Sequence, residues 1–271
     1  MNGRSPPCNM PPSAFLRVNA VGPWIRRRCV VEYDGTDFCG FQAQDQPSVM
    51  RTVQEIIENA LNRTTGETNL ARLRFASRTD TGVHARGQVV VLVNRCVESD
   101  RMTQANFDPC VDATRKRYEY ELVTGGLRPV VHRRNVWYVR KPLDVAKMQL
   151  AVSHMMAPPS AKDFSSFTPQ KALDGERGNI CTVSTIELHT ETVDERGVQH
   201  EEDVATRIRL VFEGNRFKYK MVRNMVGTIV DVGLGRLKAN EIPRILAAKN
   251  RAKAGQGAPP QGLTLVWVKY D

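Results

Sequence analysis

An arginine, an aspartate and a histidine stand close together in the segment SRTDTGVHA, at positions 77–85. Arg78 precedes Asp80 by two residues and His84 follows it by four, shortly before the apolar run VVVLV. A carboxylate held beside a guanidinium stays ionised, and an ionised carboxylate can act as a nucleophile but not as a general acid. The segment therefore indicates nucleophilic chemistry at Asp80, while the simpler interpretation of TDTG as a plain turn stays open.

Asp80, Thr81 and Gly82 also spell the tripeptide of the aspartic proteases. Those sites need two carboxylates that share one proton. This chain holds one such tripeptide, and Arg78 would oppose the shared proton, although a homodimer could supply the second carboxylate. A protease would also leave the basic charge of the chain unexplained, so it is the less favoured alternative.

The overall composition is that of a basic globular protein. Among its 271 residues, 39 Lys and Arg outnumber 29 Asp and Glu, which gives a formal charge of +10. Such an excess favours a polyanionic partner, with nucleic acid first and an acidic membrane surface second. The longest apolar stretch, 89–93, has the length of a buried strand, whereas a membrane span needs roughly 18 apolar residues. We therefore expect a nucleic-acid-binding protein rather than a membrane protein.

The six cysteines, at positions 8, 29, 39, 96, 110 and 181, form no C-x-x-C pair and no cluster with the five histidines. This scatter predicts neither a metal site nor a disulfide framework, and it is typical of reduced thiols in a reducing compartment.

The first 31 residues hold five arginines and no acidic residue. Residues 1–27 are therefore expected to form a basic N-terminal extension. It reads either as an arm or proline-rich tail, or as a transit segment that would direct the chain to the mitochondrion or another organelle rather than the cytoplasm.

Hydrophobic periodicity predicts strands and helices in alternation. Strands are expected at 28–33, 89–93, 117–123, 207–212 and 263–270, where apolar residues alternate or run together beside turn residues. Helices are expected at 53–61, 145–155, 217–229 and 242–246, where apolar residues recur every three or four positions. We infer two α+β halves, 28–110 and 111–271, with the aspartate loop in the first.

Six segments of the chain resemble, in order, the motifs of the TruA family of tRNA pseudouridine synthases. Around Asp80, SRTDTGVHA is similar to the family's G-R-T-D-A-G-V-H-A. The other five are YDGTDFCGFQAQ with TVQ (33–44 and 52–54), ATRKRYEYEL (113–122), DFSSF (163–167), MVRNMVGTIVDVG (221–233) and AKAGQGAPPQGLTL (252–265). The resemblance covers the chain from about Arg28 to its end, which a chance match of one short motif would not do.

The chain departs from the family pattern at three motif positions. Ser77 stands where the family usually has glycine, Thr81 where it has alanine, and Phe41 where it has tryptophan. A serine at position 77 would strain the loop if the backbone there needed a positive φ, which glycine tolerates. Lys218 and Lys220 occupy positions that are often apolar in the family. None of these changes removes a reactive group, so the resemblance still implies an active enzyme.

The resemblance implies an α+β fold in which two ferredoxin-like (RRM-like) halves form a continuous mixed, mainly antiparallel sheet flanked by helices, with a central cleft. It also implies isomerisation of uridine to pseudouridine in tRNA, in or near the anticodon stem-loop, with no cofactor. Asp80 would be the nucleophile, attacking either ribose C1′ or uracil C6. Arg223 would pair with Asp80 and keep it charged, and Tyr118 would stack on the uracil and assist proton transfer at C5.

Further residues of these motifs are expected to contact the RNA. Leu263 or Leu265 would form an apolar floor. Arg78 would insert into the RNA stack where the base has left, and it is the alternative partner of Asp80. The remaining candidates for substrate contacts are Phe41, Gln42, His84, Arg115, Arg117, Lys218, Lys220 and Asn224. The basic ones among them, with Lys116, Arg133 and Arg134, would follow the phosphate backbone.

The sequence leaves two functions open, each with its own partners. The resemblance implies a homodimer whose two subunits engage one tRNA. The rival hypothesis is an RNA-binding factor in ribosome assembly, acting on ribosomal RNA, possibly mitochondrial, with or without catalysis. Such a factor could have lost Asp80, Tyr118 or Arg223, and all three are present. The sequence therefore favours the enzyme.

Overall fold

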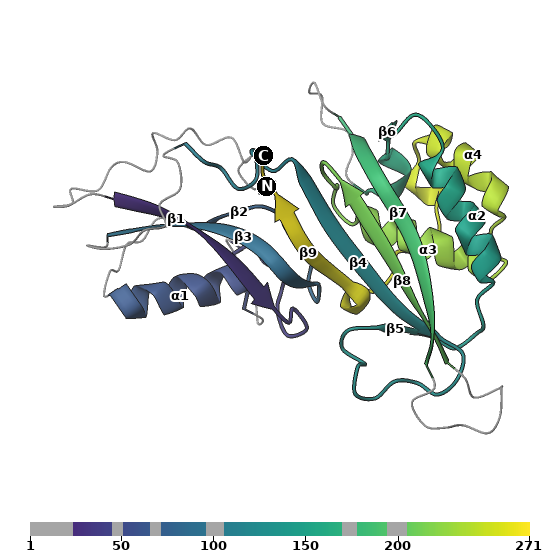
Figure 1. The fold of residues 1–271 in the computed structure, drawn as a ribbon, viewed down its shortest axis with the longest axis horizontal. Helices are drawn as coiled ribbons and strands as arrows, with labels where there is room; N and C mark the ends of the chain where they lie inside the picture. Colours follow the sequence, from purple (N-terminus) through teal and green to yellow (C-terminus); the bar gives the residue numbers. More distant parts are fainter. Residues whose placement is uncertain (1–23, 45–50, 66–71, 96–105, 170–177, 194–204) are drawn as a thin grey trace, which may run out of the picture.

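The computed structural model describes residues 24–44, 51–65, 72–95, 106–169, 178–193 and 205–271 of the chain. In these residues nine strands form one open sheet, accompanied by four α-helices (Figure 1). The strands are β1 (Trp24–Tyr33), β2 (Arg74–Phe75), β3 (His84–Arg95), β4 (Arg115–Thr124), β5 (Trp137–Val139), β6 (Ala161–Asp163), β7 (Ile180–Val193), β8 (Ala205–Gly214) and β9 (Leu263–Lys269). The helices are α1 (Val53–Thr65), α2 (Val145–Met156), α3 (Met221–Gly233) and α4 (Ile242–Ala248). The predicted α+β class with a mixed, mainly antiparallel sheet is confirmed.

The last strand of the chain lies in the middle of the sheet. The strand order is β1-β3-β9-β4-β8-β7-β6, with β2 paired to β3 and β5 to β4. β9 joins β3 in parallel through two residue pairs, His84 with Thr264 and Ala85 with Leu265, and it joins β4 antiparallel. Because β9 bridges strands from both halves, the sheet is continuous across the molecule.

The C-terminal half follows the order β4, α2, β7, β8, α3, β9, and its strands lie side by side as β9-β4-β8-β7. This is the β-α-β-β-α-β order of a ferredoxin-like unit. The N-terminal half contributes β1, α1, β2 and β3 among the described residues. A second complete unit is therefore not established there.

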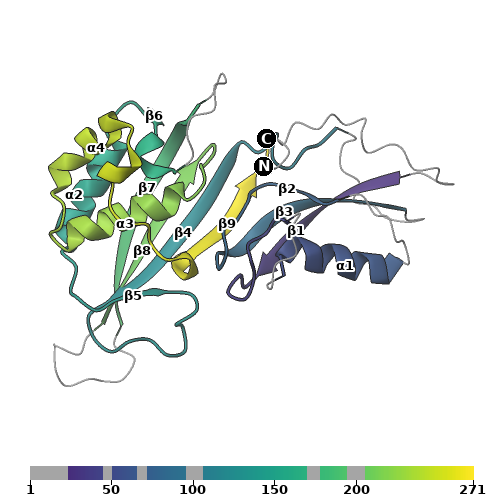
Figure 2. The same cartoon turned by 180° about the vertical axis from the view of Figure 1, so that it is seen from behind.

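Two hydrophobic clusters hold the helices against the sheet. In the larger one, Tyr118, Tyr120 and Leu122 of β4 pack with residues of α2 and α3. In the smaller one, Phe41, Val53 of α1 and Val90 of β3 pack together. Figures 1 and 2 show α1 alongside β1 and β3, and α2, α3 and α4 gathered at the other end of the sheet. Figure 1 looks onto the face of β4, β8 and β7 that no helix covers.

Local sequence explains where α1 begins. Thr52 Oγ1 accepts a hydrogen bond from the Glu55 backbone N–H at 3.3 Å, and Glu55 Oε2 accepts one from the Thr52 N–H at 2.8 Å. This reciprocal pair is a capping box, which satisfies two backbone donors that the first turn of a helix leaves free. Val53 and Ile57 then face the N-terminal cluster, as their spacing predicted.

Several elements differ from the prediction, and the short strands β2, β5 and β6 were not predicted at all. β1 begins at Trp24, so residues 24–27 belong to the sheet, and the predicted N-terminal extension is shorter than 1–27. α3 begins at Met221 rather than at 217, because Lys220 adopts a left-handed conformation (φ 57°) that a continuous helix does not contain. β7, a strand of 14 residues, was not predicted, since its polar and apolar residues gave no sustained pattern. Residues 1–23 lie outside the described part of the chain.

No helix in the described ranges has the length and apolar character that crossing a membrane requires.

Candidate active site

The loop that carries Asp80 is fixed by close backbone contacts with residues 38–41. Phe41 N–H donates to Thr79 O at 3.2 Å, and Gly82 N–H donates to Phe38 O at 3.3 Å. Gly40 has φ +85°, and a Cβ there would lie 2.6 Å from Thr79 O. Only glycine permits both this backbone conformation and this approach. The Y-D-G-T-x-F-x-G segment therefore serves to hold the aspartate loop.

Asp80 forms an ion pair with Arg223, which comes from α3 in the other half of the chain. Arg223 Nη1 donates to Asp80 Oδ2 at 2.7 Å, and the side chains are 15% and 17% exposed, respectively. Within the described residues, no hydrogen bond reaches Asp80 Oδ1 from the protein. One carboxylate oxygen is thus held by a guanidinium, and the other is left for a substrate.

The position of Arg223 is itself fixed. Every residue of α3 except Arg223 is buried, so this side chain is the one that the helix presents at its surface. Arg223 Nε donates to Ala258 O at 2.8 Å, and Ala258 N–H donates back to Arg223 O at 2.9 Å. Gly227 allows the 252–262 loop to come this close, because a Cβ there would lie 1.6 Å from Gln256 O. The guanidinium therefore reaches Asp80 with its fork already oriented.

Tyr118 lies beside the loop on β4. Its hydroxyl is 2.7 Å from Ser77 Oγ, and its ring meets Phe217 edge-on with centroids 5.3 Å apart. The residue is 5% exposed. Burial raises the pKa of the Tyr118 hydroxyl well above its ordinary value; the Ser77 hydrogen bond opposes this shift, and nearby Tyr33 and Asp80 add to it. Tyr118 is therefore protonated at neutral pH and can donate a hydrogen bond.

Several polar side chains clamp the backbone just before Asp80. Gln88 Oε1 accepts from Ser77 N–H at 3.2 Å, and Gln88 Nε2 donates to Ser77 O at 2.6 Å. Lys116 Nζ donates to Ala76 O at 2.6 Å, and the Tyr33 hydroxyl lies 2.7 Å from Thr79 Oγ1. Burial raises the pKa of Tyr33 to about 12. Sequence reasoning missed Gln88 as a positioning residue, although a lone glutamine beside an apolar run signals a buried hydrogen-bond partner.

Comparison with known proteins places this arrangement in a family. The family model described as tRNA pseudouridine synthase matches residues 29–121 and 161–271. The protein named tRNA pseudouridine synthase A from Brevibacillus brevis is 37% identical over 266 residues, covering 90% of this chain and 99% of that protein. Proteins of the same name from Thermoanaerobacter sp. and Anaplasma marginale are 35% and 34% identical over 89% and 91% of this chain, and over 98% and 100% of their own lengths. This chain belongs to the tRNA pseudouridine synthase family.

Membership in the tRNA pseudouridine synthase family confirms the resemblance that the six motifs gave. It removes the aspartic protease alternative, because the match covers both halves of the chain rather than one tripeptide. The relatives named above are bacterial proteins, so they lend no support to an organellar destination.

Several residues predicted to contact substrate are buried in the protein, and three of them are Phe41, His84 and Asn224. Phe41 has no exposed surface and packs on Tyr33 and Phe75 in the N-terminal cluster. His84 is 3% exposed, and its Nε2 lies 2.9 Å and 3.1 Å from the carbonyl oxygens of Arg134 and Gln261. These two positions of the synthase motifs join segments of the fold instead of lining a surface.

Asn224 is the third buried residue, with 3% exposure. Its Nδ2 donates to Phe167 O at 2.7 Å, and its Oδ1 accepts from Arg251 Nη2 at 2.9 Å. All of its contacts therefore tie α3 to the DFSSF segment and the last loop, and the expectation of an RNA contact is replaced by a structural one.

Leu263 and Leu265 are 6% and 0% exposed and pair across β4 with Tyr120 and Tyr118. Leu263 and Leu265 belong to the larger cluster, so the structure places them in the core, on the strand next to the tyrosines. Ser77 is absent from the non-glycine residues with positive φ in the described chain, which are Lys220 and Lys249. The expected strain from replacing glycine at position 77 is therefore absent, and the serine contributes a hydroxyl contact instead.

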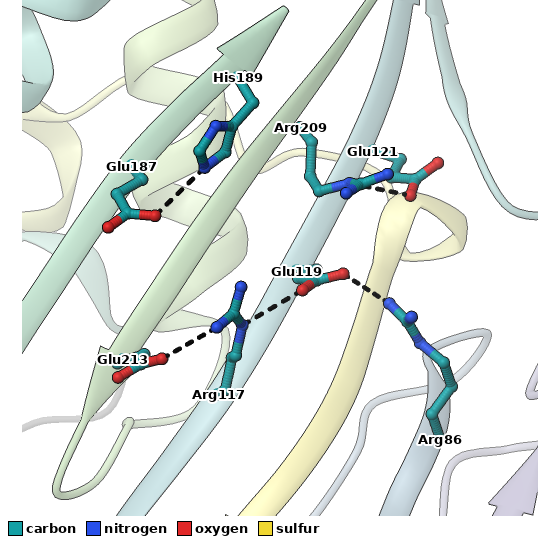
Figure 3. A network of polar contacts seen from close by, with 8 residues as sticks. All are labelled: Arg86, Arg117, Glu119, Glu121, Glu187, His189, Arg209 and Glu213. Carbon is teal, nitrogen blue, oxygen red and sulfur yellow. Dashed lines mark hydrogen bonds and ion pairs between the residues drawn. The ribbon is translucent and has the colours of Figure 1, made fainter.

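The predicted basic track is divided between different surfaces. Arg117 lies on the uncovered sheet face, where it contacts Glu119 and Glu213, both at 3.2 Å (Figure 3). Arg115 lies 3.8 Å from Glu213 and over the ring of Trp267. Arg78 and Lys220 are exposed, and Gln42 and Lys218 are half-buried. Paired arginines of this kind carry little free charge for phosphates.

The uncovered face carries further pairs of opposite charge. Arg86 donates to Glu119 at 2.6 Å, Arg209 lies 3.4 Å from Glu121, and His189 lies 3.1 Å from Glu187 (Figure 3).

In the described part of the chain, no group of three or more His, Cys, Asp or Glu residues could hold a metal ion, and Cys29, Cys39, Cys110 and Cys181 are free thiols.

Proposed function

We propose that this protein converts uridine to pseudouridine in tRNA, in or near the anticodon stem-loop, with Asp80 as the nucleophile. The observation that carries the proposal is the Asp80–Arg223 pair, in which one oxygen is held at 2.7 Å and the other has no protein donor within the described residues. An ionised, oriented and partly accessible carboxylate is what nucleophilic catalysis needs. The printed name of the relatives, tRNA pseudouridine synthase A, supports tRNA as the substrate.

The reaction is an isomerisation, so no external reagent is consumed. Asp80 attacks either ribose C1′ or uracil C6, and the N1–C1′ bond breaks. The uracil then reattaches through C5 to C1′, the bond from Asp80 to C1′ or C6 breaks and regenerates the carboxylate, C5 loses its proton, and N1 gains one. The target base must leave its stack to reach a carboxylate held in a loop. The ion pair with Arg223 holds the carboxylate in position until the base arrives.

We assign Tyr118 to contact with the target uracil. Its ring borders Phe217, and its protonated hydroxyl lies 2.7 Å from Ser77 Oγ, three residues before Asp80 in the chain. The raised pKa of Tyr118 makes its hydroxyl a hydrogen-bond donor rather than a base at neutral pH. The proton lost from C5 would therefore be relayed through the Tyr118 and Ser77 hydroxyls. A water or Asp80 would be its final acceptor.

The test is to incubate wild-type protein and Asp80→Asn with unmodified tRNA and with ribosomal RNA fragments, and to map pseudouridine at each nucleotide. We expect wild type to form pseudouridine at defined tRNA positions and Asp80→Asn to form none. The affinity of Asp80→Asn for tRNA should stay within about threefold, because phosphate contacts do not depend on the nucleophile. Product on neither RNA from wild type would reject the activity.

Three finer points extend this proposal. We propose a homodimer, as the family resemblance implies, to be tested by light scattering on the purified chain. We propose that both halves are ferredoxin-like units that face a central cleft. An organellar site of action rests on the five arginines and the absence of acids in the first 31 residues alone, and microscopy of the tagged protein would test it.

A further inference from the structure

The segment between the two site residues Phe217 and Arg223 carries an exposed aromatic ring. Phe217 contacts Tyr118, and Arg223 contacts Asp80. Tyr219 lies between them in the chain and is 52% exposed. It is the single aromatic residue among the large hydrophobic side chains that are exposed in the described ranges. An exposed aromatic ring close in the chain to the residues of the candidate site is a candidate for contact with the substrate.

The backbone around Tyr219 is held in place. Thr168 Oγ1 donates to Tyr219 O at 2.9 Å, Met221 N–H donates to Lys218 O at 3.0 Å, and Asn224 N–H donates to Lys220 O at 3.0 Å. Tyr219 and Arg223 are four positions apart, so their Cα atoms lie within about 15 Å of each other whatever the path of the chain. The backbone of Tyr219 is therefore held close in the chain to Arg223, the residue that contacts Asp80.

Lys220 adds a cation to this ring. Its Nζ lies 5.0 Å from the centroid of the Tyr219 ring. Lys220 also occupies the left-handed region, with φ 57° and ψ 7°, where glycine would fit with less strain. A non-glycine residue held in this conformation is a candidate for a functional side chain. Ring and ammonium together offer a stacking surface and a phosphate contact, the two elements that bind unpaired nucleotides.

We propose that Tyr219 and Lys220 form a stacking site for a nucleobase of the substrate RNA that neighbours the target uridine. The base lies against the open side of the tyrosine ring, and the lysine contacts the phosphate of the same nucleotide. The inference rests on the proposed function in taking the RNA to be tRNA. Stacking on an aromatic ring tolerates any base, so the site orders the strand near Asp80 without selecting a sequence.

The experiment compares the dissociation constant for unmodified tRNA, and KM and kcat for pseudouridine formation, in Tyr219→Ala, Tyr219→Leu and Tyr219→Phe. We expect Tyr219→Ala and Tyr219→Leu to weaken tRNA binding about 5- to 100-fold, the effect of removing one stacked base. Tyr219→Phe should bind within about twofold of wild type, because it keeps the ring. The loss should fall on KM more than on kcat. Leu150→Ala, on an exposed site of α2, is the matched control.

Lys220→Gly tests the second part of the site. Glycine accepts the left-handed backbone, so the fold should be kept, and the slope of log affinity against log salt should fall by about one phosphate contact. Equal affinity of Tyr219→Ala and wild type, or full binding by Tyr219→Leu, would overturn the inference. Since binding is measured without turnover, a wild type that binds tRNA through Tyr219 but forms no pseudouridine would reject the proposed function alone.

Discussion

The two faces of β4 use the same kinds of residues in opposite ways. On the covered face, Lys116 and Tyr118 make contacts at 2.6 Å and 2.7 Å with the loop that carries Asp80. On the uncovered face, Arg117, Glu119 and Glu121 form ion pairs with neighbouring strands (Figure 3). Successive side chains of a strand point to opposite faces, so the basic run from 115 to 117 is divided between them. The covered face holds the loop that carries Asp80, and the uncovered face pairs its positive charges with its negative ones.

The comparison shows why a count of basic residues predicted too broad an RNA surface. The Arg117 and Arg209 side chains are 31% and 45% exposed and their partners Glu119 and Glu121 are 9% and 28% exposed, so solvent screens these pairs mainly at the arginine. In each pair the carboxylate neutralises the arginine, so these arginines offer less positive charge to phosphates. The Asp80–Arg223 pair is screened less, at 17% and 15% exposure.

The largest effect is expected from removing the partner of Asp80. Arg223→Gln should lower the single-turnover rate on the order of 100- to 1000-fold, comparable to the loss of one essential hydrogen-bond donor at other catalytic sites. Arg223→Lys should recover part of this loss, since it keeps the charge but cannot contact Asp80 and Ala258 at once. Arg78→Gln is the control, because Arg78 was the alternative partner. A larger loss for Arg78→Gln than for Arg223→Gln would reverse the assignment.

Removing the hydroxyl of Tyr118 should have the next largest effect. We expect Tyr118→Phe to lower kcat about 100-fold, the lower end for a group that assists proton transfer. Burial raises the pKa of Tyr118, so its protonated form persists at every pH below that value, and the ratio of wild-type to variant kcat should be constant from pH 6 to about pH 9. A ratio that falls as the pH rises would mean that Tyr118 loses its proton within this range.

Ser77 offers a smaller and more specific test of the covered face. Ser77→Ala removes the partner of the Tyr118 hydroxyl, and the loss of one neutral hydrogen bond predicts about a 2- to 10-fold lower kcat. The pKa of Tyr118 should rise further, because the Ser77 hydrogen bond lowers it. In a Tyr118→Phe background, the same substitution should cost nothing more. Equal costs in both backgrounds would show that Ser77 acts on the loop rather than through Tyr118.

The sequence predicted most elements of this fold because local signals agree with the tertiary contacts. The capping box of α1 and the periodic apolar residues of α2 are examples, since each can be recognised within a dozen residues. The beginning of α3 could not be predicted, because the spacing of Phe217 and Met221 looks helical while the left-handed Lys220 stands between them. Strand order also required the structure, as nothing local places β9 between β3 and β4.

The sequence named the candidate reactive residues, whose roles stay predictions, but it did not name the residues that hold them in place. Asp80, Tyr118 and Arg223 come from motifs, and their meeting depends on segments far apart in the sequence. His84 and Asn224 were predicted to contact RNA because they are polar, but both are buried. A sequence does not reveal that their partners inside the fold include backbone carbonyls. Gln88 and Ser77 were overlooked as supports for the same reason, since their value lies in a contact with one neighbour.

The smallest effect is expected on the uncovered face, and it tests the comparison most directly. Arg117→Gln combined with Glu213→Gln removes an ion pair while keeping the net charge, so tRNA affinity should change by less than about twofold and stability by less than about 1 kcal/mol. Binding at several salt concentrations and thermal unfolding would measure both. A loss of affinity with a salt slope lowered by about one would mean that Arg117 exchanges its carboxylates for a phosphate when RNA binds. The ion pairs of this face would then be a resting state that RNA opens, and the two faces of β4 would share the work of binding.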